Sequence, residues 1–321
     1  PFHLNTGRLR DQWHGMSRSG RVARLWGHAP EPAVTLNPGD LARHGIKAGD
    51  IVQLESRRGM LRLVAEVDGS VAPGQAFLPM HWGSRHLAGE GINTLTLPVI
   101  DPKSFQPELK HCAISVSKAE LPWRLIAFGT PRDGDALAQL ARVQAWLPQF
   151  EFATCALTPE AGGVLLRAAA TQAPADEVLA RLHALFELDG DDVMRYDDRH
   201  RGNVRRVRLH EGRVAAVCLS GDGTGESWLR EFHAQGLPAA ALGAMLLAPT
   251  AKAPGGAAAR GRIVCSCFGV GETAINSALQ SAGGDAAARV SAAQQQLRCG
   301  TQCGSCLPEL RRLAASAVMA A

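Results

Sequence analysis

Four cysteines near the end of the sequence have a spacing suited to metal binding, in Cys265-Ser-Cys267 and Cys303-Gly-Ser-Cys306. Short loops of this kind bring thiolates together on one metal centre, and the neighbouring glycines let backbone N–H groups approach the sulfurs and stabilise their charge. A structural zinc ion and an iron-sulfur cluster both accept four cysteines, so the spacing alone leaves the metal open between them. A pair of ordinary buried thiols is the less favoured alternative.

The remaining cysteines help to define the chemistry. Cys299 lies near the second pair, whereas Cys112, Cys155 and Cys218 occur singly. This clustering favours a metal site in a reducing compartment over a disulfide framework. Cys112 is expected to be a core thiol.

Length and composition exclude several classes of protein. A chain of 321 residues predicts two or three domains, and because it begins at Pro1 without an initiator Met we expect part of a longer or processed protein. The apolar share of 46% and charged share of 20% exclude disorder, collagen and coiled coils. A net charge of +4 is too small for a dedicated nucleic-acid binder. No apolar run is long enough to span a membrane, and the start lacks the apolar segment of a secretory signal.

Residues 1–121 read as a β-rich domain. A strand is expected at Ala33–Leu36, followed by a short helix with Asn37 as N-cap and Pro38 in its first turn, ended by Gly45. Alternation places Val52 and Leu54 inward on one strand and predicts four inward residues on the next, after a turn at 57–59. These four are Leu61, Leu63, Ala65 and Val67. A further strand ending at Pro79 completes a set of closely spaced strands that indicates a barrel.

Residues 122–250 read as an α+β module. Strands are expected at 152–157, 164–170, 204–209 and 213–219, and helices at 175–186, 227–234 and 238–247. Residues 251–261 lack large apolar side chains and read as a linker.

Residues 262–321 read as a small helical domain around the cysteines. Val270, Ile275, Ala278 and Leu279 have helical spacing after the first pair, and a second helix follows Cys306. Because so short a domain buries little core, we expect a bound metal cluster to stabilise it.

The C-terminal motifs resemble a known domain. The segments IVCSCFGVGETAI and LRCGTQCGSCLPEL resemble the small 2Fe-2S domain of bacterioferritin-associated ferredoxin, which is also appended to assimilatory nitrate and nitrite reductases. The resemblance covers residues 262–321 and implies Cys265, Cys267, Cys303 and Cys306 as cluster ligands. Cys299 occupies a position where such sequences often carry another Cys, and is expected to be a neighbouring thiol rather than a ligand.

The N-terminal block carries a second resemblance. LNTGRLRDQWHGMSRSG, followed by PMHWG and DPKSFQPELKH, resembles the C-terminal domain of molybdopterin oxidoreductases of the dimethyl sulfoxide reductase superfamily, most closely assimilatory nitrate reductase catalytic subunits. In these proteins the domain is a double-psi β-barrel that binds molybdopterin guanine dinucleotide. Thr-Gly would offer backbone donors to phosphate, Arg would pair with it, and Trp and His would offer planar contacts.

This resemblance implies a set of cofactor-binding residues: Thr6, Gly7, Arg8, Gln12, Trp13, His14, Arg18, His81, Asn93 and Lys110. Trp82, next to His81, is expected either to pack in the core or to contact the cofactor. The molybdenum ligand and a 4Fe-4S cluster are expected in N-terminal domains outside this sequence, so the chain alone is expected to be inactive.

The middle module resembles more loosely the small domain that precedes the same 2Fe-2S domain in nitrite reductase large subunits, through residues 196–202 and 219–222 with Trp228-Leu229. Gly221-Asp-Gly-Thr-Gly225 could bind phosphate, but a turn is favoured. A basic run could dock an acidic electron donor, but a solvated, charge-balanced strand face is favoured because acidic residues lie just upstream. Its members are Arg199, Arg201, Arg205, Arg206, Arg208 and Arg213.

Together these resemblances imply the C-terminal part of a cytoplasmic assimilatory nitrate reductase catalytic subunit, reducing nitrate to nitrite. Electrons from an NAD(P)H-dependent reductase subunit, a ferredoxin or a flavodoxin would enter at the 2Fe-2S cluster, with molybdenum and the 4Fe-4S cluster in the rest of the protein. The alternatives are another molybdopterin oxidoreductase such as a formate dehydrogenase, a non-catalytic electron-transfer or metal-binding module, and a structural zinc protein. No nucleic acid or membrane partner is expected.

Overall fold

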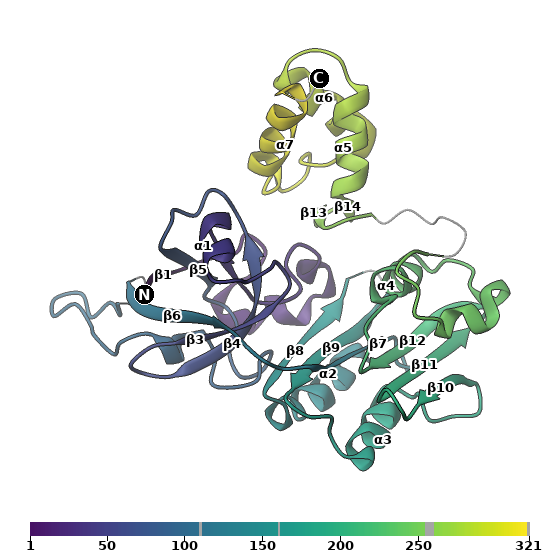
Figure 1. Cartoon of the computed structure of the whole chain (residues 1–321). Helices are drawn as coiled ribbons and strands as arrows, with labels where there is room; N and C mark the ends of the chain where they lie inside the picture. Colours follow the sequence, from purple (N-terminus) through teal and green to yellow (C-terminus); the bar gives the residue numbers. More distant parts are fainter. Residues whose placement is uncertain (109–110, 160, 254–259, 320–321) are drawn as a thin grey trace.

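The computed structural model describes residues 1–108, 111–159, 161–253 and 260–319 (Figure 1). Its N-terminal part contains a closed barrel in the order β1-β5-β2-β4-β3-β6. The β1–β5 and β2–β4 pairs are parallel, and the other neighbours are antiparallel. The strands are β1 Phe2–Gly7, β2 Ala33–Leu36, β3 Ile51–Glu55, β4 Met60–Val67, β5 Gln75–Pro79 and β6 Cys112–Lys118. The predicted barrel is confirmed.

Alternation along β3 and β4 determines which side chains fill the barrel. Val52, Leu54, Leu61 and Leu63 are buried, as the period of two predicts. Val67 was expected to point inward, but it is 50% exposed. It is the last residue of β4 and pairs with Leu36 at the end of β2, where the strand leaves the barrel and the alternation no longer determines burial.

The short helix α1 (Pro38–Arg43) begins and ends as expected. The Asn37 side chain accepts a hydrogen bond from Gly39 N, and Pro38 lies in the first turn. Gly45 has a φ of 64°, in the left-handed region that commonly follows a helix.

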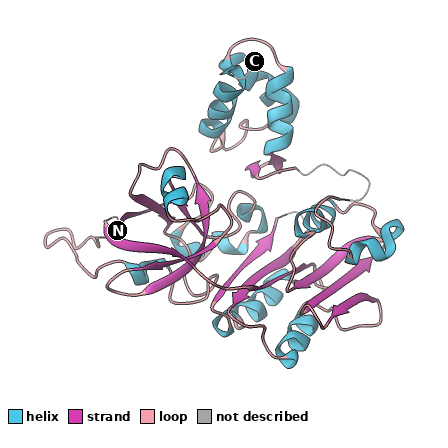
Figure 2. Ribbon diagram, viewed as in Figure 1, coloured by secondary structure: helices cyan, strands magenta, loops and turns pink. Residues whose placement is uncertain are grey.

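The middle part is a six-stranded antiparallel sheet in the order β10-β11-β12-β7-β9-β8 (Figure 2). Helix α4 packs on β12 and β7, and α2 packs on β8 and β9. The strands are β7 Trp123–Gly129, β8 Phe152–Thr158, β9 Gly163–Ala170, β10 Val193–Asp198, β11 Asn203–His210 and β12 Arg213–Ser220. The helices are α2 Ala136–Gln144, α3 Asp176–Leu185 and α4 Glu226–Gln235, with a 3₁₀ turn η5 at Leu147–Gln149.

Two expectations for this part need correction or addition. The segment expected to be a helix at 238–247 is 3₁₀ structure, η6 (Ala240–Leu247), interrupted at Gly243 by a φ of 49°. Strands β7 and β10 and helix α2 were not predicted. β7 is buried almost throughout, because it lies in the interior of the sheet between β12 and β9, so it shows no alternation.

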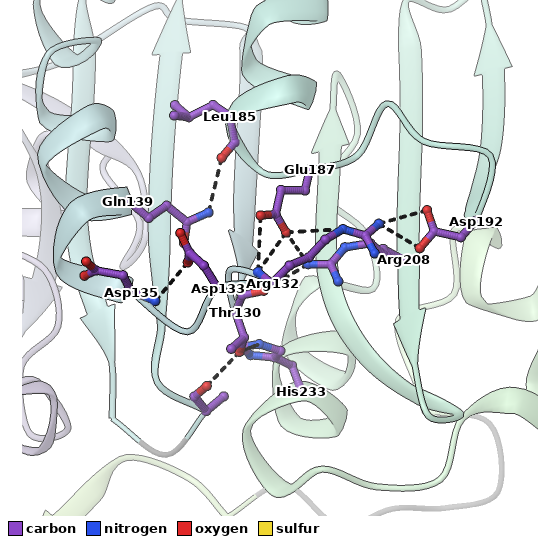
Figure 3. A network of polar contacts seen from close by, with 11 residues as sticks. Thr130, Arg132, Asp133, Asp135, Gln139, Leu185, Glu187, Asp192, Arg208 and His233 are labelled. Atoms are coloured by element: carbon purple, nitrogen blue, oxygen red, sulfur yellow. Dashed lines mark hydrogen bonds and ion pairs between the residues drawn. The ribbon is translucent and has the colours of Figure 1, made fainter.

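Two arginines of the basic run, both on β11, do not lie on the solvated strand face that we expected, whereas Arg199, Arg201 and Arg213 are exposed. Arg205 is 1% exposed and Arg208 is 2% exposed. Buried cations need partners, and the structure supplies them: Arg205 pairs with Asp222 at 3.0 Å, and Arg208 pairs with Glu187 at 3.1 Å while donating to the Thr130 carbonyl. Figure 3 shows that Arg132 belongs to the network of Arg208 and Glu187 and donates a hydrogen bond to Asp192. The expected charge balance is therefore present, but two of these arginines are structural.

The glycine-rich segment after β12 is a turn, as favoured. Asp222 Oδ1 accepts hydrogen bonds from the backbone N–H of Thr224 at 2.8 Å and from its hydroxyl at 2.6 Å. The Asp222 side chain therefore accepts the Thr224 donors itself, as in an Asx-turn.

The C-terminal part has a separate hydrophobic core formed around α5 (Glu272–Ser281), α6 (Ala286–Leu297) and α7 (Leu307–Met319). A two-stranded sheet, β13 (Ile263–Cys265) and β14 (Val270–Gly271), precedes the helices (Figure 1). Val270 was expected on the first helix but lies in β14, where it pairs with Cys265. The helix α6 was not predicted.

Among the described residues, no helix is both long and apolar enough to cross a membrane.

Candidate functional site

The first candidate site begins where the chain leaves β1. Thr6 and Gly7 end this strand in register with Leu78 and Pro79 of β5. A Cβ atom on Gly7 would lie 2.5 Å from the Phe77 ring, so a larger residue here would displace that ring. Thr6 is buried. These two residues therefore determine where the next segment starts.

Residues 8–28 are here named the cofactor loop, after the binding role that the resemblance implies. They contain the 3₁₀ turns η1 (His14–Met16), η2 (Ser19–Arg21) and η3 (Ala23–Trp26). His14, Gly15 and Met16 have φ values of 45°, 58° and 63°. Left-handed conformations are costly for residues with side chains and concentrate at functional sites. This backbone geometry was not predicted, although the His-Gly pair was a signal for it.

Four of the predicted binding residues are exposed on this loop: Arg8, Trp13, His14 and Arg18. The Arg8 guanidinium lies over the Trp13 ring, 5.3 Å from its centroid, and the Trp13 and His14 rings are 5.2 Å apart. Trp13 is 58% exposed, which is unusual for so large an apolar ring. Exposed cations beside flat rings suit a ligand with phosphates and planar heterocycles.

Gln12 is used inside the loop. It is 2% exposed, its Nε2 donates to the Leu25 carbonyl at 3.1 Å, and its Oε1 accepts from the Ser19 hydroxyl at 2.9 Å. Both ends of the amide are therefore engaged, and Gln12 maintains the loop's shape. Ser19, which also accepts from Trp13 N, was not predicted.

His81 connects the loop to the segment after β5. Its Nε2 accepts a hydrogen bond from Leu9 N at 3.0 Å. Burial, together with the positive charge of Arg8, lowers the pKa of His81, so its neutral form is favoured and can act as this acceptor. Its neighbour Trp82 is 2% exposed and packs edge-on against Trp26, which favours the packing role.

Asn93 lies on the next turn, η4 (Ile92–Leu95), and is exposed. A Cβ on Gly91, just before this turn, would lie 2.8 Å from Gly83 Cα, so the turn begins against the segment that holds His81 and Trp82. Lys110 lies outside the described residues.

The second candidate site consists of the four predicted cysteine ligands. Cys265 ends β13, while Cys303 and Cys306 lie in the connection between α6 and α7. The Cys267 and Cys303 sulfurs are 3.2 Å apart, and the Cys306 side chain interacts with that of Cys265. The structure therefore brings the four thiols together as two pairs, with the first pair partly exposed and the second buried.

The pKa values of two of these thiols are shifted in opposite directions. Burial and the nearby Cys265 raise the pKa of Cys306 to about 12, whereas the Ser305 hydroxyl, 3.1 Å from the sulfur, lowers the pKa of Cys303. A buried thiolate needs a positive partner, which iron or zinc supplies. Ser305 was not predicted, although its position inside the Cys-x2-Cys loop was the available signal. Cys299 is fully buried in the small core, where the pKa of its thiol is raised by burial.

In the part of the chain that the structure describes, no group of three or more His, Cys, Asp or Glu side chains is arranged to hold one metal ion. A 2Fe-2S cluster divides four cysteines between two irons. The observed arrangement in two pairs fits that division.

Comparison with protein families covers both sites. The Molydopterin dinucleotide binding domain matches residues 2–113, and the BFD-like [2Fe-2S] binding domain matches residues 263–316. The chain carries both domains. With them come two cofactors, a molybdopterin dinucleotide and a 2Fe-2S cluster. The exposed Arg8–Trp13 pair and the paired thiols fit these groups chemically.

Relatives match this chain to different extents. A nitrate reductase from Klebsiella oxytoca is 29% identical over 98% of this chain and 34% of its own length. A nitrate reductase from Symbiobacterium thermophilum is 40% identical over 37% of this chain and 16% of its own length. The chain thus spans about a third of the length of the first relative. Acetylene hydratase from Pelobacter acetylenicus matches 37% of this chain and 18% of its own at a TM-score of 0.32 and 19% identity, a likeness too weak to identify a fold.

Proposed function

We propose that the chain is the C-terminal part of an assimilatory nitrate reductase catalytic subunit that acts in the cytoplasm and reduces nitrate to nitrite. The observation that carries the proposal is the union of the two cofactor-binding domains in one chain, together with a nitrate reductase that aligns with 98% of it. The reaction consumes two electrons and two protons and releases water with nitrite. In this proposal the molybdenum ligand and a 4Fe-4S cluster belong to the remaining part of the parent protein.

The molybdopterin dinucleotide supplies the redox chemistry when bound, and the protein supplies binding, orientation and electrostatics. Arg8 and Arg18 would pair with the phosphates, and Trp13 and His14 would contact the planar groups. Thr6 and Gly7 would offer backbone donors where the loop begins. Gln12 and His81 hold the loop in shape through contacts with Leu25, Ser19 and Leu9. Asn93 and Lys110 are proposed to complete the cofactor contacts.

The proposed role of the second domain is electron entry. Cys265, Cys267, Cys303 and Cys306 would hold the 2Fe-2S cluster, and the partly exposed Cys267–Cys303 pair would face the electron donor. An NAD(P)H-dependent reductase subunit, a ferredoxin or a flavodoxin would supply the electrons. The double-psi form of the barrel belongs to the same proposal.

Two measurements test this function. The full-length protein, purified with its cofactors, is expected to oxidise a reduced viologen dye when nitrate is added and to form one nitrite for every two electrons. Reduction of dye by formate, with no response to nitrate, would instead indicate a formate dehydrogenase. The purified chain is expected to be coloured and to give a paramagnetic resonance signal after reduction. A colourless chain with one zinc and no iron would eliminate electron entry.

A further inference from the structure

The cofactor loop also contacts the 2Fe-2S domain. The Arg10 guanidinium forms an ion pair with Glu309 at 2.9 Å, and it also donates a hydrogen bond to the Val264 carbonyl. Asp11 accepts a hydrogen bond from the Ser266 hydroxyl at 2.8 Å. Val264 and Ser266 flank Cys265, so these two loop residues contact both chain neighbours of a proposed cluster ligand.

A second set of contacts lies further along the same loop. Arg24 Nη1 donates to the Cys267 carbonyl at 3.4 Å. Gly27 lies against Ile263, since a Cβ at this position would be 3.3 Å from Ile263 Cγ2. His28 Nε2 is 3.7 Å from Glu309. The contact surface therefore follows the loop from Arg10 to His28 and meets β13 and the start of α7.

Glu309 is the centre of this surface. Its side chain is only 13% exposed, and it is paired with Arg10 of the loop and with Arg262 of its own domain. Burial raises its pKa, but His28, Arg262 and Arg10 together outweigh burial and lower the pKa to about 2. The carboxylate is therefore ionised, and removing one cation would leave a half-buried negative charge with fewer partners.

Residues of the proposed dinucleotide site alternate along the loop with residues that contact the 2Fe-2S domain. Arg8 and Trp13 are exposed and belong to the proposed dinucleotide site, whereas Arg10 and Asp11 between them contact the other domain. The same backbone segment thus faces the proposed dinucleotide site on one side and the 2Fe-2S domain on the other. We propose that the cofactor loop is a docking surface that seats the 2Fe-2S domain beside the dinucleotide site, with Arg10–Glu309 as its central ion pair and Arg10 as a positioning residue.

This inference rests on the two domains and does not depend on nitrate as substrate. The docked position keeps the cluster next to the loop that binds the other cofactor. Dinucleotide binding and docking of the cluster domain both require the same ordered loop. Each should therefore favour the other.

The test uses the cluster-loaded chain with a protease site inserted between Ala253 and Arg260, cleaved after purification. At low salt the two pieces are expected to elute together. Arg10→Met and Glu309→Gln should each weaken their association about tenfold or more, and the double variant should be weaker by less than the product of the two effects. High salt should weaken the unmutated pair as well. Arg311→Met, on an exposed residue of the same helix as Glu309, is the matched control and should change nothing.

Separation of the unmutated pieces at low salt would overturn the proposal, and so would a response of Arg10→Met equal to that of the control. Visible absorption of each variant verifies that the cluster is loaded. Pieces that remain associated while binding zinc instead of iron would leave docking intact and refute the electron-entry function, so the two ideas can fail separately.

Discussion

The barrel and sheet differ from the C-terminal domain in how their cores are built. One continuous hydrophobic core runs through the barrel and the sheet, from Phe2 to Leu246. The C-terminal core is separate and small, and its buried members include the thiols of Cys265, Cys299 and Cys306. Large cores can be stabilised by apolar burial alone, whereas very small ones need additional stabilisation such as a bound metal. The larger region should therefore fold on its own packing, while the smaller one should depend on its cluster.

The two regions can be followed separately. All tryptophans lie between Trp13 and Trp228, so tryptophan fluorescence reports only the larger region. Visible absorption by an iron-sulfur cluster would report only the smaller one. One region can therefore be perturbed while the other is followed as a control.

Loss of a cluster ligand should have the largest effect. Cys265→Ser and Cys306→Ser are each expected to abolish bound iron and to unfold the C-terminal helices, because binding free energy is folding free energy in such a domain. Fluorescence-detected unfolding of the larger region should remain. Iron content and helical circular dichroism measure the first effect. Cys299→Ala is the matched control, and equal loss of iron in this variant would make Cys299 a ligand.

Truncation of a side chain in the large core should destabilise the larger region and leave the cluster in place. Leu63→Ala removes a fully buried barrel side chain and should lower the free energy of unfolding by about 2–5 kcal/mol. Urea unfolding followed by fluorescence measures the change, and cluster absorption in water should be unaffected. Val67→Ala, on the exposed end of β4, should change the free energy by about 0.5 kcal/mol or less. A loss of the cluster in Leu63→Ala would mean that the cores are not independent.

Acid should weaken the larger region through its buried histidines. Burial lowers the pKa of His86, His183 and His233 to about 4. The unfolded chain binds protons at the ordinary pKa of about 6.5, so the unfolded state carries more protons between pH 6.5 and pH 4, and stability falls as the pH falls through this window. Each histidine should cost about 3 kcal/mol by pH 4. A urea midpoint that did not change over this window would contradict the burial of these rings.

The smallest effect on stability is expected at the exposed loop. Trp13→Ala should change the free energy of unfolding by about 0.5 kcal/mol or less, because the ring is 58% exposed. The same change should weaken dinucleotide binding by about tenfold. Retention of the cofactor on a desalting column measures this, with Val22→Ala, another exposed apolar residue of the loop, as control. Unchanged retention would remove Trp13 from the site.

The sequence predicted well those features that depend on local pattern. Strands β3 and β4 of the barrel followed from alternation, the helix after Asn37 from its cap, and the proximity of the cysteines from their spacing, whereas β1 was not predicted. Features that depend on tertiary contacts were not predicted from the sequence. β7 shows no alternation because both its faces are covered, and Arg205 and Arg208 look like surface residues until Asp222 and Glu187 are placed beside them. The contact between Arg10 and Glu309 joins residues far apart in the chain, and no local pattern encodes it.

The position of β6 has a consequence for the timing of synthesis. Its residues pair with β1 through Phe2–Ile114 and with β3 through Val52–Lys118, so this single strand closes the ring. Until residue 118 has left the ribosome, β1 cannot have both of its neighbours, and pairings of such long separation form slowly. Domains generally fold as units during translation. The loop that follows β1 is therefore made early but positioned late, so the dinucleotide should be inserted only after the whole barrel has emerged.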